Sequence, residues 1–211
     1  NFKPLPPQAT VIQLQQELNI SEPLAILLAQ RGITTFQQAK DFFRPTLSQL
    51  HNPFLMKGMK EAVERLDQAL KNNETILIYG DYDVDGTSAV SLMERYLSTF
   101  TSKLHTYVPD RYTEGYGISF QGINYAKTQG CTLIIALDCG IKAIDKVQYA
   151  KEKGIDCIIA DHHRPSDQVP DAVAVLDPQQ ADCLYPYKEL CGCGLGFKLA
   201  QAYHEYLQRP F

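Results

Sequence analysis

The feature that most constrains the fold is an alternation of short apolar runs with amphipathic stretches from residue 75 onward. The apolar runs have the length of strands and span residues 75–79, 104–108, 133–137, 157–160 and 172–176. Helical patterns span residues 88–100, 120–129, 141–153 and 195–207. Strands that alternate with helices are joined by right-handed crossovers and pair into a mainly parallel sheet. We therefore predict an α/β fold with helices on both faces of this sheet.

The N-terminal third has a different pattern, rich in helix signals and poor in strand signals. Ser21 stands where it can cap one helix, and a shorter helix follows Thr35. Residues 59–70 place apolar side chains at helical spacing. We expect a small helical N-terminal region at residues 1–72, followed by the α/β domain at residues 73–211.

Composition narrows the class of protein. The chain has 20 Lys and Arg against 24 Asp and Glu, a formal charge of −4, so a broad basic nucleic-acid surface is not expected, although local phosphate sites remain open. No apolar run approaches the ~18–20 residues that span a bilayer, which excludes a membrane protein. The six cysteines contain no C-x-x-C pair, and we expect a reducing, cytoplasmic location.

Acidic and imidazole side chains follow three of the predicted strands. Asp81 begins a run of acids after the first strand, Asp138 follows the third, and Asp161, His162 and His163 follow the fourth. Ligands of such sheets bind beyond the carboxyl ends of the strands. These side chains are therefore expected at one edge of the sheet.

Three of the acids, Asp81, Asp83 and Asp85, alternate along the chain. In an extended segment, side chains two apart point the same way, and clustered carboxylates repel one another unless a cation binds. With Asp138 and His162 nearby, the donors suit Mn²⁺ or Mg²⁺, and Zn²⁺ less well. One or two ions fit such a site.

Several simpler explanations compete with the metal site. The acidic run begins like a calcium-binding EF-hand loop, but the twelfth position, which should be Glu, is Leu92. The run could also be a solvated turn, Asp138 a helix cap, and the two histidines structural. The placement of all three clusters at strand ends favours the metal site.

Together these segments resemble the first three motifs of the DHH phosphoesterase superfamily. Within it, the chain is similar to RecJ-type single-strand-specific DNA exonucleases from about residue 41 onward. The segments that carry the resemblance are GDYDVDGT at 80–87, PDR at 109–111, EGYG at 114–117, DCG at 138–140, DHH at 161–163 and GLGFKL at 194–199.

The resemblance implies a role for each side chain of the cluster. The implied metal ligands are Asp83, Asp85, Asp138 and His162. His163 would lie beside the scissile phosphate, and Asp161 would orient the histidines. Asp81 would contact the metal ligands rather than the metal itself.

Side chains that bind nucleic acid are expected in two places. The guanidinium of Arg111 suits a phosphate, and the rings of Tyr112 and Tyr116 can stack on bases. Lys198 lies in the first turn of the last helix, where a positive charge opposes the helix dipole and so hints at a neighbouring phosphate.

The function implied by the resemblance is metal-dependent 5′-to-3′ hydrolysis of single-stranded DNA in repair and recombination. Relatives also carry a further metal-binding Asp, a second phosphate-binding domain and an OB-fold, and none of these is found in this sequence. We therefore interpret the chain as the N-terminal catalytic portion and expect it to be inactive or weak alone.

Two alternatives stay open. One is a DHH phosphoesterase that acts on oligoribonucleotides or cyclic dinucleotides, although Tyr79 stands where those relatives usually have His. The other is a non-catalytic DHH scaffold, which the three intact motifs disfavour.

Overall fold

The computed structural model describes residues 3–208, and the chain divides into two compact units, Asn1–Leu50 and His51–Phe211. The sequence pattern placed the boundary at residues 72/73, and the outer ends of the predicted domains, 1–2 and 209–211, lie outside the described residues. The division falls earlier because helix α4 (Met59–Lys71) belongs to the second unit. Met59, Val63 and Leu66 are fully buried in its main core.

The first unit is a cluster of short helices. It contains α1 (Gln8–Leu18), α2 (Glu22–Ala29), α3 (Phe36–Phe43) and the 3-10 turn η1 (Leu47–Gln49). Its core is formed by Val11, Leu14, Ala25, Leu28, Ile33 and Ala39. Thr35 caps α3 as predicted, since its side chain accepts a hydrogen bond from the Gln38 amide. Ser21 precedes α2, but its side chain makes no capping hydrogen bond.

A five-stranded sheet organises the second unit, and every pairing within it is parallel. The strands are β1 (Thr75–Gly80), β2 (Leu104–Tyr107), β3 (Cys131–Leu137), β4 (Asp156–Ala160) and β5 (Ala174–Leu176). Their spatial order is β2-β1-β3-β4-β5. The predicted α/β class is confirmed.

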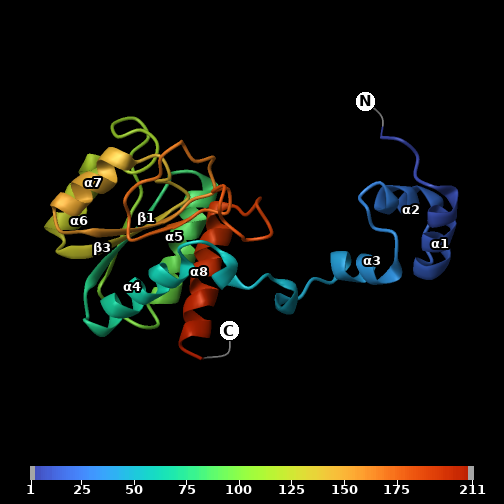
Figure 1. The fold of residues 1–211 in the computed structure, drawn as a ribbon, viewed down its shortest axis with the longest axis horizontal. Coiled ribbons are helices and arrows are strands. Elements are labelled where there is room, and N and C mark those ends of the chain that lie inside the picture. Colours follow the sequence, from blue (N-terminus) through green and yellow to red (C-terminus); the bar gives the residue numbers. More distant parts are fainter. Residues whose placement is uncertain (1–2, 209–211) are drawn as a thin grey trace. The chain divides into compact units, whose positions relative to one another are not determined.

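Helices cover both faces of the sheet (Figure 1). Besides α4, the unit contains η2 (Pro53–Leu55), α5 (Val84–Leu97), α6 (Phe120–Thr128), α7 (Ile144–Glu152) and α8 (Gly192–Tyr206). One apolar cluster joins the sheet to α4, α5 and α8, and a second joins its other face to α6 and α7. Alternate residues of β1 divide between the clusters, Ile76 and Ile78 in the first, Leu77 and Tyr79 in the second.

Helix α5 begins four residues earlier than the sequence pattern predicted, at Val84 rather than at residue 88. The side chain of Asp83 accepts a hydrogen bond from the Gly86 amide and so caps the helix. The expectation of an extended run through Asp81, Asp83 and Asp85 was therefore wrong. Asp83 is the cap, and Asp85 lies in the first helical turn.

Two further observations concern the described part of the chain as a whole. No helix in it has both the length and the apolar character to cross a membrane. All six cysteines are free thiols, and Cys131, Cys139, Cys157 and Cys183 are buried.

Candidate metal centre

Four strands end level with one another, and an aspartate follows each of them. In the register of the sheet, Gly80 pairs with Leu137, Leu137 with Ala160, and Ala160 with Leu176. The next residues along these strands are Asp81, Asp138, Asp161 and Asp177. All four are buried. The predicted gathering of acids at the carboxyl edge is confirmed, and Asp177 is an addition that the sequence analysis did not include.

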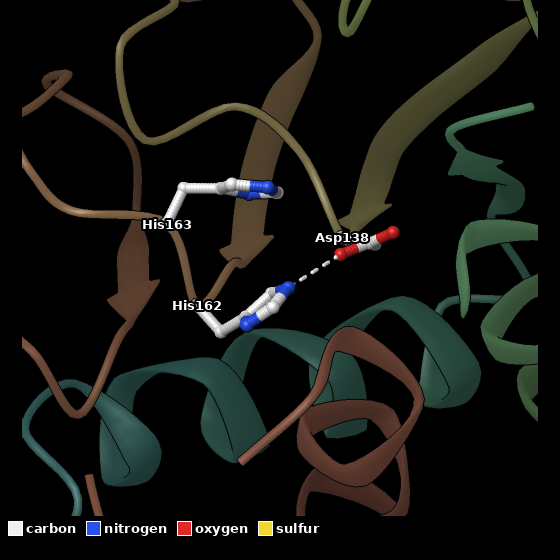
Figure 2. A group of neighbouring side chains, drawn as sticks. All are labelled: Asp138, His162 and His163. Carbon is white, nitrogen blue, oxygen red and sulfur yellow. Dashed lines mark ion pairs between the residues drawn. The ribbon is translucent and has the colours of Figure 1, made fainter. Parts of the chain in front are cut away.

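The side chains of Asp138, His162 and His163 form the centre of this edge, as Figure 2 shows. One potential ligand atom from each lies within 4.8 Å of the others. His162 Nε2 is 3.1 Å from Asp138 Oδ1. Carboxylate and imidazole donors that converge in this way suit a divalent ion such as Mn²⁺, Mg²⁺ or Zn²⁺.

The carboxylate of Asp138 is the strongest indication that a cation belongs here. Its side chain is 2% exposed, and Oδ1 has no hydrogen-bond partner among the described residues. Burial, reinforced by repulsion from Asp85 and Asp83, raises the pKa of Asp138 to about 7. A buried carboxylate without a donor is costly, and a divalent ion supplies the missing positive charge. The residues present therefore fit a metal ion.

Asp85 approaches the centre while it caps a helix. Its Oδ2 lies 3.7 Å from His162 Nε2. The same carboxylate accepts hydrogen bonds of 2.7 Å from the amides of Gly192 and Cys193, at the start of α8. The positive end of the helix dipole thus stabilises the charge on Asp85.

Gly192 is a part of the centre that the sequence analysis missed. A Cβ atom added there would overlap the side chain of Asp138. Only glycine lets the start of α8 approach this carboxylate so closely. The GLGFKL segment of the sequence analysis includes Gly194 and Gly196 but not Gly192. A glycine-rich turn alone does not show which of its glycines faces the site.

Asp83 and Asp81 occupy different surroundings at the end of β1. Asp83 is exposed, and repulsion from its charge contributes to the raised pKa of Asp138. Asp81 is fully buried, where Oδ1 accepts a hydrogen bond from the Gly117 amide and Oδ2 has no partner among the described residues. Burial raises the pKa of Asp81 as well.

Asp161 fixes the DHH segment to the loop after β3. Its Oδ1 lies 2.7 Å from Nδ1 of His163 and also accepts a hydrogen bond from the His163 amide. Its Oδ2 accepts from the amide of Ile141. Burial alone would raise the pKa of Asp161, but these hydrogen bonds outweigh it and hold the pKa below its ordinary value. The hydrogen bond that His163 donates to Asp161 raises the pKa of His163.

The loop after β2 brings aromatic side chains to the centre. The hydroxyl of Tyr116 lies 3.2 Å from the carbonyl oxygen of Asp138 and 3.2 Å from Nε2 of His163. The guanidinium of Arg111 lies 5.4 Å from the ring centroid of Tyr82. The centroids of the Tyr82 and Tyr116 rings are 6.2 Å apart, and the two rings are nearly perpendicular. Sequence reasoning missed Tyr82, although it stands inside the acidic run. The rings of Tyr82 and Tyr116 thus lie between Arg111 and the centre.

Two other predicted contacts differ from each other in exposure. Tyr112 is 93% exposed and free to meet a ligand. Lys198 is 2% exposed, and its ammonium donates hydrogen bonds to the His51 carbonyl and to Gln201 Oε1. These internal hydrogen bonds disfavour the predicted contact between Lys198 and nucleic acid.

The segment after β5 holds the backbone of His162 in place. The side-chain amide of Gln179 donates a 2.9 Å hydrogen bond to the carbonyl oxygen of His162. Asp177 in turn accepts a hydrogen bond from the Gln179 amide, and burial raises the pKa of Asp177 to about 6. The only sequence signal for this support is the end of the fifth apolar run at Asp177.

Comparison with known families and structures agrees with this geometry. Residues 75–210 match the DHH family, N-terminal domain. The single-stranded-DNA-specific exonuclease RecJ of Bacillus subtilis (strain 168) is 44% identical over 197 residues, which cover 93% of this chain and 25% of that protein. RecJ of Thermus thermophilus is 29% identical over 98% of this chain and 29% of that protein.

Solved structures show the same architecture. A crystal structure of RecJ in complex with Mn²⁺ from Thermus thermophilus superposes with a TM-score of 0.77 and 27% identity, over 98% of this chain and 28% of that one. A crystal structure of exonuclease RecJ bound to manganese gives a TM-score of 0.67 and 31% identity, over 74% and 39% of the two chains. The chain thus spans about a quarter to a third of the curated relatives it matches.

Proposed function

The chain belongs to the DHH family, and from this premise we propose that it is the catalytic portion of a metal-dependent, single-stranded-DNA-specific exonuclease. The observation that carries the proposal is the buried carboxylate of Asp138, whose Oδ1 accepts no hydrogen bond from the described residues and lies 3.1 Å from His162 Nε2. The names of the most similar curated relatives supply the substrate class.

The ion is proposed to be Mn²⁺ or Mg²⁺, bound singly or as a pair. The side chains that would hold it are Asp83, Asp85, Asp138 and His162. The ion supplies positive charge for the phosphoryl oxygens and acidifies the attacking water. The protein's contribution is to keep the acids together, and the amides of Gly192 and Cys193 do this for Asp85.

His163 is proposed to act on the phosphate. Its raised pKa favours the protonated ring, which can donate a proton to the leaving oxygen or a hydrogen bond to a phosphoryl oxygen. Asp161 accepts from Nδ1, so that Nε2 is the atom left to serve the substrate. Tyr116 lies within reach of Nε2 and can share a ligand with it.

Single-strand selectivity is proposed to come from the loop after β2. Unpaired bases expose their faces, which stack on aromatic rings, whereas phosphates pair with guanidinium groups. Arg111, Tyr82 and Tyr116 offer these groups beside the centre, and the exposed ring of Tyr112 lies in the same loop as Arg111 and Tyr116. A 5′-to-3′ direction and a role in repair and recombination belong to the same proposal, as does a cytoplasmic location, which the six free thiols support.

The proposal can be tested with the 211-residue chain itself. Mn²⁺ binding is measured by electron paramagnetic resonance, and cleavage is measured in single-turnover reactions with excess protein. We expect slow, Mn²⁺-dependent release of mononucleotides from single strands, little from duplexes, and loss of both binding and cleavage in Asp138→Asn. Absence of Mn²⁺ binding contradicts the metal site. Cleavage of dinucleotides or cyclic dinucleotides but not of longer strands would favour a phosphoesterase for small substrates.

A further inference from the structure

A cavity of about 540 Å³ opens beside His163, on the side of the sheet covered by α6 and α7. One wall is the segment from Tyr116 to Gln121, and the other is the loop after β3, from Gly140 to Ala143. The volume lies within the roughly 300–1,000 Å³ typical of pockets for small ligands. Roles were expected for Tyr116, Asp161 and His163 in this lining, but none for Phe120, Lys142 or Lys146.

Lys142 is exposed and forms no ion pair with any described residue. It lines the same cavity as His163. Lys146 pairs with Asp145 at 2.8 Å, but Asp145 is 61% exposed and holds the ammonium weakly.

Two acids in the wall, Asp161 and Glu114, keep their negative charge, but their oxygens already accept hydrogen bonds from donors of the protein. Asp161 accepts hydrogen bonds from His163 and Ile141. Glu114 accepts from Tyr107, Ser119 and the Asp110 amide. The first turns of α6 and α7 also line the cavity, and their amides add positive potential.

Apolar surface lies next to these charges. The ring of Phe120 is 41% exposed within the wall, and Lys146 Nζ lies 5.3 Å from its centroid. Tyr116 lines the same cavity and is 54% exposed. A flat ring beside one ammonium group, with a second lysine in the same lining, matches a ligand that joins an aromatic base to a phosphate.

We propose that this cavity binds one nucleotide of the strand, with its phosphate at Lys142 and Lys146 and its base against Phe120. The inference rests on the proposed function, since it places the nucleotide next to the phosphate that His163 serves. It assigns a binding role to three side chains outside the metal centre. Metal is not needed for this contact.

The test uses the 211-residue chain in EDTA, titrated with thymidine 5′-monophosphate and followed by the amide resonances of its NMR spectrum. We expect saturable shifts centred on residues 118–121 and 140–146. Lys142→Ala/Lys146→Ala should weaken binding about tenfold. Lys151→Ala/Lys153→Ala is the matched control, since it removes two charges near the other end of α7, and should bind normally.

Two further arms identify the ligand. Phe120→Ala should weaken binding of the nucleotide but not of inorganic phosphate, and thymidine alone should bind more weakly than the nucleotide. Equal loss in both double variants, equal binding of phosphate and nucleotide, or shifts outside the cavity would each overturn the proposal. All variants are first checked for native thermal melting.

Failure here is distinguishable from failure of the proposed function. If the chain cleaves single strands with Mn²⁺ but the cavity variants bind and cleave normally, only the nucleotide cavity is wrong. If the cavity binds the nucleotide as described but the chain binds no Mn²⁺, the metal-dependent exonuclease proposal is wrong and the cavity stands.

Discussion

Nδ1 of His163 lies 2.7 Å from Oδ1 of Asp161, and the other oxygen of that carboxylate accepts a hydrogen bond from the Ile141 amide. One buried acid thus connects the DHH segment to the loop that follows the neighbouring strand. The imidazole is held in place by the same group that raises its pKa. Position and protonation of His163 are therefore controlled together.

Asp161→Asn should lower the pKa of His163, because the amide keeps the shape but loses the charge. The pair stabilises the fold where both groups are ionised. The lowered pKa of Asp161 contributes stability that is lost as pH falls below about 4. The raised pKa of His163 contributes stability that is lost as pH rises from about 6.5 through the pKa of His163 in the folded state. NMR titration of the His163 ring and denaturant melts across this range measure both effects. Asp182→Asn, which breaks an exposed pair with Lys57, is the control. An unchanged His163 titration would contradict the coupling.

Asp138→Asn should stabilise the metal-free chain at pH 8. Because burial raises the pKa of Asp138 to about 7, ionisation costs the fold progressively more as pH rises from about 4 through 7. The gain is at most roughly 4 kcal/mol. Asn also suits the left-handed backbone of this position, φ 61°, which Ala would strain.

The same pair of proteins responds differently to Mn²⁺. We expect the ion to raise the melting temperature of the wild type by mass action and to leave Asp138→Asn unchanged. Thermal melts at pH 8 with and without Mn²⁺ measure this. If Asp138→Asn is less stable than the wild type in EDTA, the charge on Asp138 does not destabilise the metal-free fold.

Gly192→Ala should destabilise the fold by about 1–3 kcal/mol and weaken Mn²⁺ binding, because the new methyl group overlaps the side chain of Asp138. Gly194→Ala is the matched control in the same turn of α8. A Cβ there meets no atom closer than 3.5 Å, and the change should be neutral or stabilise by about 0.5–1 kcal/mol. Urea melts and Mn²⁺ titrations compare the two, and equal effects would disprove the contact.

Lys198→Ala should cost roughly 1–3 kcal/mol of stability without changing nucleotide affinity. The variant leaves the His51 carbonyl without its donor and removes a buried side chain. Chemical denaturation and nucleotide titration are measured on the same samples. A loss of affinity in a variant of native stability would restore the nucleic-acid role that the structure argues against.

The fold was largely predictable because its signals are local. Each strand run and each separating helix carries its own periodicity, and the parallel order follows from their alternation. The unit boundary was not predictable, since the pattern of α4 shows an apolar face but not the surface that covers it. The start of α5 was missed because Asp83 and Asp85 fit both an extended run and a helix cap.

The centre was predictable to the extent that its residues follow strands. Asp138 and His162 meet because neighbouring parallel strands end at one edge. The contacts of Asp85 with Gly192 and of Lys198 with His51 join positions 107 and 147 residues apart, and no local pattern carries such information. Lys198 was expected to contact a phosphate because its charge opposes the helix dipole. In the structure, its ammonium donates instead to the carbonyl oxygen of His51.

The two amides that hold Asp85 lie 107 and 108 positions further along the chain. During translation, Asp85 emerges long before the start of α8, whose amides bind it. A nascent chain that has not yet extended past residue 193 carries its acidic cluster uncapped. The hydrogen bonds that hold Asp85 at the centre therefore form only after α8 has been synthesised and has docked.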